Sequence, residues 1–228
     1  MILLGVIVNS VAVLFGGLSG LILKNGIPAR FGDLIMNGLG LFTLAVGTSF
    51  FLKSENIMIV ILSIVIGCIL GEWLNIDKRL EDLGNSVKER SNKTSADKFS
   101  KGFVTATLMF CVGSMAIMGS LQSGLLNNHE ILYTKSIMDG ITALILGSAF
   151  GVGVAFSVLP LFLYQGSIVL LASFISPYLS NSVINEMTAV GGILLIGLAL
   201  VVLDIRKIKV ANMLPALLVP IIIMMLSK

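Results

Sequence analysis

Six polar side chains lie inside or at the ends of long apolar stretches of the sequence, and their chemistry suits the binding of a small solute or ion. They are Asn9, Ser114, Gln122, Asp139, Gln165 and Glu186. Lipid offers no hydrogen bonds, so a polar group within a membrane must find a partner in the protein, in water or in a ligand. Amides and hydroxyls bind polar solutes, and a carboxylate binds a proton or a cation. We therefore predict that these six residues form a substrate- or ion-binding site.

Asp139 and Gln165 are the leading candidates, because each stands deep in an apolar context. Asp139 follows Ile137 and Met138, and Lys135 lies one turn earlier as a partner for its charge. Gln165 is part of the sequence LYQGS, next to a flexible glycine. Ligand binding and hydrogen bonding between helices both explain these two residues, and the sequence leaves both open.

The other candidates also have structural explanations. Gln122 and Asp139 are expected at the facing ends of consecutive helices, where they would line one cavity open to the outside. Glu186 is expected in the first turn of a helix, where a carboxylate opposes the helix dipole. Glu72 beside Trp73 has the composition of a membrane-interface pair, so it is not predicted to bind a ligand.

Enzyme motifs are nearly absent. Residues 17–20 read GLSG, a short serine-nucleophile pattern, but a serine needs a base to take its proton. The single histidine, His129, lies in a predicted outer loop, and the sequence HEIL lacks the second histidine of a zinc protease. Both cysteines, Cys68 and Cys111, lie within apolar runs, which argues against a disulfide framework or a metal cluster. We expect no catalysis, no cofactor and no bound metal.

The composition requires a membrane around these residues. Of the 228 residues, 56% are apolar and only 12% are charged, against about 25% charged residues in soluble domains. The mean hydropathy is +1.03. The net charge of +3 is too small to indicate a nucleic-acid partner. The predicted fold class is an all-α polytopic membrane protein, a single transmembrane domain over 1–228 whose main partner is the lipid bilayer.

About eight stretches are long enough to cross a bilayer as helices, which takes about 20 apolar residues. The weakest boundary separates the fifth and sixth stretches at SVLP (157–160), where Pro160 suits the first turn of the sixth helix. The N-terminal stretch has no basic region and no cleavage site, so it is predicted to be a retained span. The eight stretches are 2–23, 34–52, 57–74, 102–123, 137–156, 160–176, 187–203 and 210–226.

The distribution of Lys and Arg orients these spans. With eight spans, three of the fifteen basic residues fall on one face and twelve on the other, seven of them between Lys78 and Lys101. The positive-inside rule makes the twelve-charge face cytoplasmic, so both termini are predicted outside and the loop 76–101 inside. Apolar spacing from Ile76 to Val87 predicts a short amphipathic helix on the inner face.

The sequence also predicts an inverted repeat. Repeat unit one is 1–75 and repeat unit two is 160–228, with the two central helices, 102–159, between them. Each unit contains a glycine-rich span, a charged turn and a final apolar span, and NGLGLFTLAVG (37–47) matches MTAVGGILLIG (187–197). Because five spans separate the two starts, the units run in opposite directions. Inverted 3+3 repeats are typical of secondary transporters, whose binding sites lie near the repeat interface.

Small residues are spaced for close helix packing. The pairs Gly16 and Gly20, Gly67 and Gly71, and Gly147 and Gly151 each place both members on one helix face. Such faces suit packing within the chain and also allow a homodimer. The stretch CVGSMAIMGSLQSG (111–124) is rich in small and polar residues. We predict a buried central helix that is either broken in this stretch or continuous and closely packed.

Ordered strings along the whole chain resemble one family. They are NSVAVLFGGLSGLILK (9–24), LGEWL (70–74), LMFCVGSMAIMGSLQSGL (108–125), TKSIMDGI (134–141), LYQGSI (163–168), EMTAVGG (186–192) and VANMLPALL (210–218). The chain is similar in these strings to bacterial integral-membrane proteins of the YdfK/YqgA type, a domain of unknown function. The resemblance implies a multi-pass protein of the bacterial cell (inner or plasma) membrane, and it carries over no catalytic residues.

These features predict a membrane transporter or channel for a small solute or ion. Its site would lie among the central helices near the repeat interface, with Asn9, Gln165 and Glu186 contributing and Asp139 coupling to a proton or cation. The alternative is a non-transporting sensor, scaffold or accessory subunit that engages a partner through the loop 76–101. Deleting much of that loop would leave a transporter active and abolish the function of a scaffold.

Overall fold

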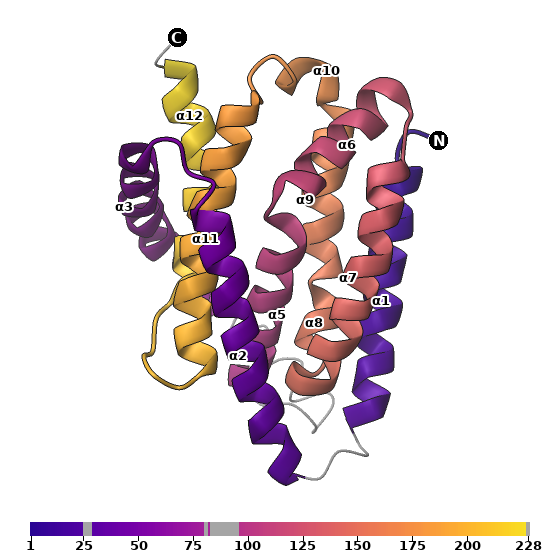
Figure 1. The fold of residues 1–228 in the computed structure, drawn as a ribbon, viewed down its shortest axis with the longest axis vertical. Coiled ribbons are helices and arrows are strands. Elements are labelled where there is room, and N and C mark those ends of the chain that lie inside the picture. Colours follow the sequence, from indigo (N-terminus) through magenta and orange to yellow (C-terminus); the bar gives the residue numbers. More distant parts are fainter. Residues whose placement is uncertain (25–28, 80–81, 83–95, 227–228) are drawn as a thin grey trace. The chain divides into compact units, whose positions relative to one another are not determined.

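The structure of the protein is a computed structural model that describes residues 1–24, 29–79, 82 and 96–226. Every regular element in these residues is a helix, as Figure 1 shows. The residues group into two compact units by their contacts, Met1–Ala29 with Gly84–Pro177 (unit 1) and Arg30–Leu83 with Tyr178–Lys228 (unit 2). The all-α prediction is confirmed for the described residues.

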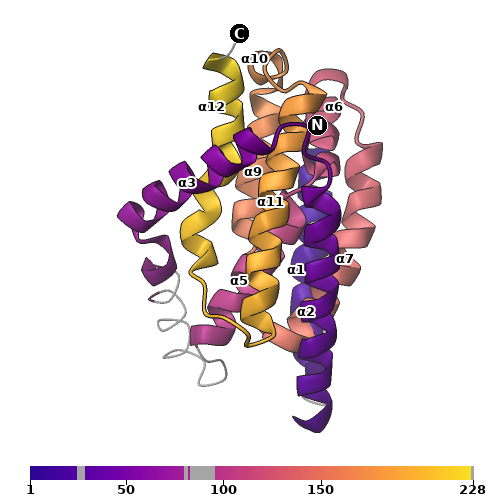
Figure 2. The ribbon, with the colours of Figure 1, turned by 60° about the vertical axis from the view of Figure 1, so that its left-hand side comes forward.

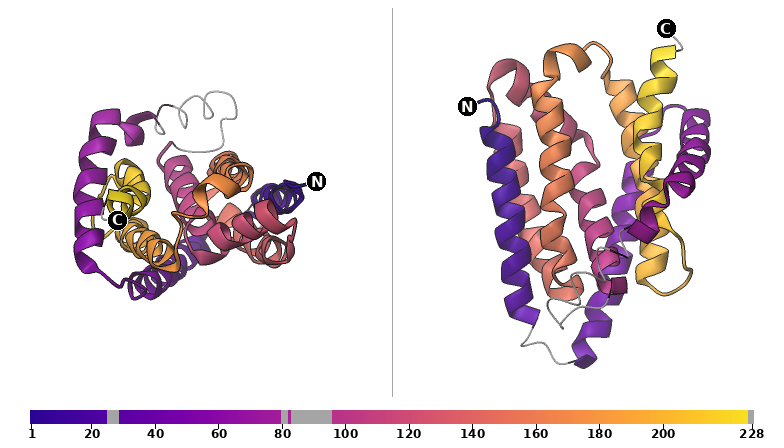
Figure 3. Two further views of the ribbon diagram at one scale, coloured as in Figure 1. Left: turned by 90° about the horizontal axis from the view of Figure 1, so that it is seen from above. Right: turned by 180° about the vertical axis from the view of Figure 1, so that it is seen from behind.

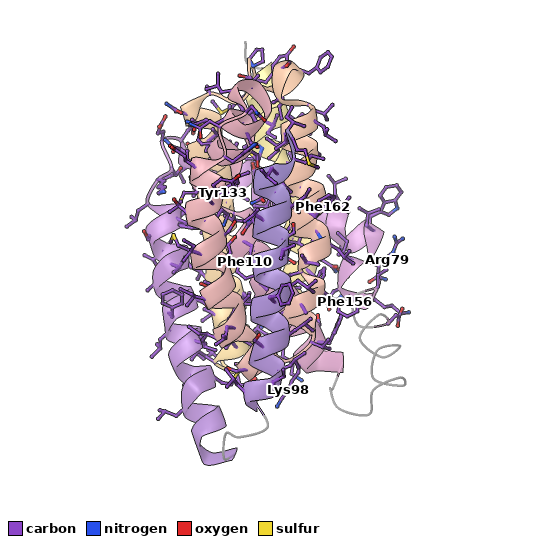
Figure 4. The ribbon with its side chains drawn as sticks, turned by 90° about the vertical axis from the view of Figure 1, so that its right-hand side faces the viewer. Arg79, Lys98, Phe110, Tyr133, Phe156 and Phe162 are labelled. Atoms are coloured by element: carbon purple, nitrogen blue, oxygen red, sulfur yellow. The ribbon has the colours of Figure 1, made fainter. Side chains whose placement is uncertain are left out.

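Unit 1 contains long helices and short ones that connect or extend them. The long helices are α1 (Leu4–Lys24), α5 (Ala96–Cys111), α6 (Ser114–Leu126), α7 (Glu130–Phe150) and α9 (Val158–Leu170). The short helices are α8 (Gly153–Phe156) and α10 (Ala172–Ile175). The rings of Phe99 on α5 and Phe156 on α8 pack edge to face with their centroids 5.5 Å apart. Figure 4 shows Phe156 and the buried Phe110 among these helices.

α1 and α7 lie side by side and run in the same direction (Figure 1). Gly16 of α1 faces Gly140 of α7 and Gly20 faces Leu144, so the residue numbers rise together along the pair. A Cβ added at either glycine of α1 would overlap a backbone carbonyl of α7. Glycine therefore lets the two backbones touch, and the packing predicted for Gly16 and Gly20 is confirmed.

The stretch 111–124 contains a helix break. α5 ends at Cys111 and α6 begins at Ser114, with the two axes bent by 57°. Gly113 between them has φ 115° and ψ 152°, a conformation open to glycine and closed to other residues. Of the two forms predicted for this stretch, the structure shows the broken one.

The start of α7 differs from the predicted span 137–156. The prediction began the span after Lys135, on the assumption that a lysine marks a polar boundary. α7 instead begins at Glu130, and Lys135 lies inside it as the partner of Asp139. The predicted boundary was wrong because a lysine that is paired on its own helix does not end that helix.

The turn after α7 also lies earlier than predicted. α7 ends at Phe150 rather than at 157–160, and Gly151, which caps it, has a φ of 86° that suits glycine. Gly151 thus ends a helix instead of packing against one, unlike its partner Gly147, which lies against α1 at Gly17. Pro160 does lie in the first turn of α9, as predicted.

Unit 2 contains α2 (Ala29–Phe51), α3 (Ile57–Leu74), α11 (Asn181–Val202), the 3₁₀ helix η1 (Val210–Leu218) and α12 (Val219–Leu226). α3 crosses η1 closely, as Figures 2 and 3 show. A Cβ at Gly67 would overlap Ala216, and one at Gly71 would overlap the carbonyl of Asn212. The close packing predicted for these two glycines is confirmed.

Several helices are long and apolar enough to cross a membrane. Four meet this description alone, Leu4–Leu23, Ile57–Leu74, Gly153–Leu170 and Asn181–Val202, and the bent pair Lys98–Cys111 with Met115–Leu126 is a fifth if it is one broken span. The described residues thus form a multi-pass membrane protein. The eight predicted spans include three further segments: Met36–Phe51 and Val210–Met224 are shorter apolar helices, and α7 carries an ion pair. The count of eight stays a prediction.

The predicted cytoplasmic loop 76–101 is described only in part. Residues 76–79 are helical, and α5 begins at Ala96, so the end of the segment is helical as well. Residues 80–81 and 83–95, with most of the predicted amphipathic helix, lie outside the described residues.

Candidate functional site

Three of the predicted site residues meet inside unit 1. Nδ2 of Asn9 on α1 donates a hydrogen bond to Oδ2 of Asp139 on α7, at 3.1 Å. The same nitrogen donates to Oε1 of Gln165 on α9, at 3.2 Å. Asn9 and Gln165 are fully buried, and Asp139 is 6% exposed. We refer to Asn9, Asp139 and Gln165, together with Lys135, as the polar cluster.

The carboxylate of Asp139 is neutralised by Lys135 on the preceding turn of α7. Nζ of Lys135 lies 2.8 Å from both carboxylate oxygens. The side chains are 7% and 8% exposed. This is the partner that the four-residue spacing predicted. A buried pair of this kind costs desolvation on both charges, so it is weak evidence for added stability.

Two atoms of the polar cluster have no partner in the described residues. An ionised carboxylate only accepts hydrogen bonds, so the nitrogen of Asn9 must face Asp139. That nitrogen uses its two hydrogens on Asp139 and Gln165. Oδ1 of Asn9, an acceptor, and Nε2 of Gln165, a donor, are left buried and unpaired. Buried polar atoms in proteins are nearly always paired, so these two atoms mark where a polar ligand or water would bind.

α5, which ends at the break with α6, packs against α7 and α9, the helices that carry Asp139 and Gln165. Cys111, the last residue of α5, is buried. Two buried hydroxyls of the same unit also lack partners in the described residues, Oγ of Ser10 and Oγ1 of Thr107. The sequence did not single them out, because a hydroxyl in a helix usually bonds the carbonyl four residues earlier. Their positions in the sequence could have identified them, because Ser10 follows Asn9 and Thr107 lies one turn before Cys111.

Two other predicted residues lie on α6. Ser114 begins that helix directly after the break, and its side chain lies outside the described residues. Gln122 lies near the other end of α6, where its backbone carbonyl accepts hydrogen bonds from Asn127 and Asn128. Asp139 lies midway along the 21 residues of α7. The prediction that Gln122 and Asp139 lie at facing helix ends was wrong, because α7 begins earlier than expected.

His129 has a partner that the sequence did not predict. Its Nδ1 lies 2.7 Å from Oγ of Ser123, and that hydroxyl donates to the carbonyl of Ile2 at 3.0 Å. The ring of His129 is close to that of Tyr133, which Figure 4 shows at the start of α7. These contacts join the N-terminus to the connection between α6 and α7.

Glu186 belongs to unit 2 and has a different set of partners. Its Oε1 accepts hydrogen bonds from the backbone N–H groups of Glu55 and Asn56, both at 2.7 Å. Its Oε2 accepts one from Oγ of Ser54 at 3.0 Å. Glu186 lies in the second turn of α11, since Ser180 caps that helix, and not in the first turn as predicted. Its carboxylate holds the turn between α2 and α3, and the sequence reading of a dipole partner in its own helix was wrong.

Glu55 makes the reciprocal contacts from that turn. Its carboxylate accepts hydrogen bonds from Oγ of Ser182 and Nδ2 of Asn185, both at 2.7 Å. These donors, first Ser182 and then Asn185, lower the pKa of Glu55 because they favour the ionised form. The turn and the start of α11 are therefore joined by two carboxylates that point in opposite directions.

Glu72 at the end of α3 is bonded more extensively than its sequence context indicated. It accepts hydrogen bonds from Nζ of Lys209 at 2.8 Å and from Nδ2 of Asn212 at 2.6 Å. Oδ1 of Asn212 accepts one from the backbone N–H of Asp77 at 2.7 Å. Trp73 beside it is 82% exposed, in keeping with a ring at the membrane interface.

Comparisons with known proteins place the whole chain in one family. Residues 4–225 match the family described as "Protein of unknown function (DUF554)". The chain is 37% identical over 220 residues to "Uncharacterized membrane protein YdfK" of Bacillus subtilis (strain 168), covering 95% of this chain and 93% of that protein. It is 29% identical over 219 residues to "Uncharacterized protein YqgA" of Escherichia coli (strain K12), covering 94% and 93%. No solved structure matches the chain. The chain therefore belongs to the DUF554 family, to which the resemblance to YdfK and YqgA pointed.

Proposed function

We propose that the protein carries a small solute or ion across the bacterial cell membrane, through a site formed by the polar cluster. The observation that supports this most is a buried ion pair next to two buried atoms without partners, Oδ1 of Asn9 and Nε2 of Gln165. A partly satisfied buried network is worse than an apolar core, which favours a bound ligand or water at these two atoms. Ionisable residues within membrane helices most often mark solute or ion pathways.

The break between α5 and α6 supports the same proposal. A broken helix leaves backbone carbonyl and N–H groups without partners at the ends that meet there. In transporters such breaks lie at the binding site, where the free backbone groups bind the substrate. α5, which ends at this break, packs against α7 and α9, the helices that carry Asp139 and Gln165. A ligand at the polar cluster would therefore have both side-chain and backbone groups within reach.

Contacts within unit 2 support the proposed inverted repeat. α2 and α11 meet where Gly47 and Gly192 approach each other's backbone. These two glycines are 145 residues apart in the sequence. A two-fold axis in the membrane plane that exchanged residues with this separation would map the contact onto itself.

The contacts of α3 with η1 fit the same axis. Gly67 lies on Ala216, and Gly71 lies on Asn212. Asn212 follows Gly67, and Ala216 follows Gly71, by the same 145 residues, so the axis would exchange one contact with the other. The sequence match of 37–47 with 187–197 implies a separation five residues larger, and the contacts favour the shorter one.

The parallel course of α1 and α7 supports the predicted count of eight membrane spans. Parallel neighbours require an odd number of crossings between them. α2, α3 and the bent pair α5–α6 supply three if each crosses once, so α1 and α7 would start on the same face. With the positive-inside orientation, that face is outside, together with both termini.

Asp139 is the proposed coupling residue, because it is the one carboxylate of the polar cluster. The test is uptake of a panel of labelled small solutes and ions into proteoliposomes, with and without a proton gradient, for the protein and for Asp139→Asn. We expect gradient-dependent uptake by the protein and gradient-independent uptake or none by the variant. Equal dependence on pH and ions in the two proteins would sink the coupling role. No uptake of any panel member would favour the sensor or scaffold alternative.

A further inference from the structure

The orientation of two amides in the polar cluster depends on the ionisation of one carboxylate. With Asp139 ionised, the nitrogen of Asn9 faces it and the oxygen of Gln165 faces Asn9. The outward groups are then an acceptor, Oδ1 of Asn9, and a donor, Nε2 of Gln165. Each amide can reverse by turning about its last side-chain bond, which exchanges its oxygen and nitrogen.

Protonation of Asp139 inverts this pattern. A proton from the aqueous phase forms one O–H bond at Oδ2, and no other covalent bond changes. Oδ2 then donates, and turning the oxygen of Asn9 toward it lets that oxygen accept the new bond. The same oxygen now faces Gln165, whose nitrogen must turn to donate. The outward groups become a donor, Nδ2 of Asn9, and an acceptor, Oε1 of Gln165.

The charge of the cluster changes at the same step. Lys135 and Asp139 together are neutral when both are ionised. A proton on Asp139 leaves the ammonium of Lys135 without its counter-charge, so the pair gains one net positive charge. An uncompensated charge in a buried site is costly, and a bound anion removes that cost.

The geometry points to a proton-dependent anion site: we propose that protonated Asp139 reverses Asn9 and Gln165 and that the cluster then binds a small monovalent anion. This inference rests on the proposed transport function and specifies its substrate class. The proton and the anion would bind and leave together, which keeps the buried site neutral in every step.

Few other titratable groups surround Asp139 in the described residues. α7 itself supplies Lys135, and α5 supplies the thiol of Cys111. α9 supplies Tyr164, the residue before Gln165. α1 contributes the amide of Asn9, and neither α6, with the sequence SMAIMGSLQSGLL, nor α8, with the sequence GVAF, contributes a titratable side chain. Asp139 is thus the one carboxylate that Asn9 contacts.

The chain allows the reversal of the Gln165 amide to be followed by NMR. It contains two glutamines, Gln122 and Gln165, and only Gln165 is bonded to the polar cluster. Labelling the glutamine side chains with ¹⁵N therefore gives two pairs of amide signals in an NMR spectrum of the protein in detergent. Gln122→Leu assigns them, and in the unsubstituted protein Gln122 is the internal control. The signals would be followed as a function of pH in sodium gluconate and in sodium chloride.

We expect the Gln165 signals to titrate and the Gln122 signals to stay constant. Chloride should move the midpoint of the Gln165 titration to higher pH, since an anion that binds the protonated form favours it. A tenfold preference for that form moves the midpoint by about one pH unit at saturation. Gluconate, which is larger, serves as the reference anion.

Variants separate the reversal of the two amides from a general effect of pH. Asp139→Asn can donate to Asn9 at all pH values, so Gln165 should stay in the reversed state and chloride should bind without pH dependence. Asn9→Leu should abolish the titration of Gln165. Asn9→Ala, which also lacks a side-chain hydrogen-bonding group, serves if Asn9→Leu does not fold, and it should also abolish the titration.

Two results would overturn the inference. One is a Gln165 signal that does not change between pH 4 and pH 10 in the unsubstituted protein. The other is a Gln165 titration that persists in Asn9→Leu or Asn9→Ala. Neither result depends on transport, so a failure of uptake in proteoliposomes with an intact Gln165 titration would count against the proposed function alone.

Discussion

Asn9 and Asp139, 130 residues apart in the chain, are joined by a hydrogen bond of 3.1 Å inside unit 1. This bond fixes which end of the Asn9 amide faces the carboxylate, and through Gln165 it fixes the polarity of the atoms that remain free. The close packing of α1 on α7 through Gly16 and Gly20 holds the two residues at this distance.

Asn9→Leu should destabilise the protein by about 1–3 kcal/mol, because it removes a buried donor from two acceptors at once. Thermal unfolding in detergent measures the change. Asn37→Leu is the matched control, since Asn37 is exposed on α2 and the same substitution removes no buried bond there. Equal effects of the two substitutions would contradict the assigned role of Asn9.

Lys135 and Asp139 should show strong coupling in a double-mutant cycle. Lys135→Met leaves a buried carboxylate without its counter-charge and should cost about 3–5 kcal/mol. Asp139→Leu should be similarly costly, and the double variant should cost far less than the two together. Additive effects would mean that the charges do not interact. Lys209 and Glu72, whose side chains are 60% and 59% exposed, are the comparison pair and should show little coupling.

Gly71→Ala should destabilise unit 2, because a Cβ at Gly71 would overlap the Asn212 carbonyl. The expected cost is about 1–3 kcal/mol, the usual range for overpacking. Gly38→Ala is the control on α2, where no atom lies within 4 Å of the added Cβ. It should be neutral or stabilising by up to about 1 kcal/mol, since alanine favours helix. A destabilising Gly38→Ala with a neutral Gly71→Ala would be incompatible with the packing described.

Glu55 should make the turn between α2 and α3 sensitive to acid. Its pKa is lower in the folded protein than in the unfolded chain, because Ser182 and Asn185 bond the ionised form. The resulting stability is present above the ordinary carboxyl pKa and is lost as pH falls through the lowered value. Thermal unfolding between pH 7 and pH 3 should show a smaller acid-dependent loss for Glu55→Gln. Ser182→Ala combined with Asn185→Ala should reduce it in the same way, and an unchanged loss would refute the assignment.

Cysteine labelling tests the proposed orientation. In a chain with Cys68→Ala and Cys111→Ala, Ser180→Cys should react with a membrane-impermeant reagent from the outside alone. Ser180 precedes α11 and is exposed, so its replacement should be accessible. Labelling from the cytoplasmic side alone would reverse the orientation and remove the support from the positive-inside rule.

The residues of the polar cluster could be found from the sequence, because an amide or carboxylate in an apolar helix stands out by composition alone. Their assembly could not. The sequence predicts Asp139 at a helix end because a lysine such as Lys135 usually marks a polar boundary. Only the pairing of the two side chains shows that the helix continues. Asn9 reaches both of its partners because α1 packs against α7 and α9, and contacts between distant helices are not encoded in local spacing.

Glu186 is a residue whose role the sequence did not predict. Its position before a glycine-rich span suggested a site residue or a dipole partner, but its carboxylate binds backbone N–H groups at Glu55 and Asn56. Backbone donors leave no mark in a sequence. For Gly113 the sequence predicts two forms, broken or continuous, since a glycine among small residues permits a bend without requiring it.

The most direct test of the transport proposal uses a thiol that the chain already contains. Cys68→Ala leaves Cys111, the last residue of α5 at the helix break, as the one cysteine, and it is 6% exposed. A small, charged, membrane-impermeant methanethiosulfonate would be added to right-side-out and to inside-out vesicles. A transporter must open its site to both faces, so we expect Cys111 to react from each side. If Cys111 does not react from one side or from both, yet reacts fully after denaturation, the proposal is contradicted.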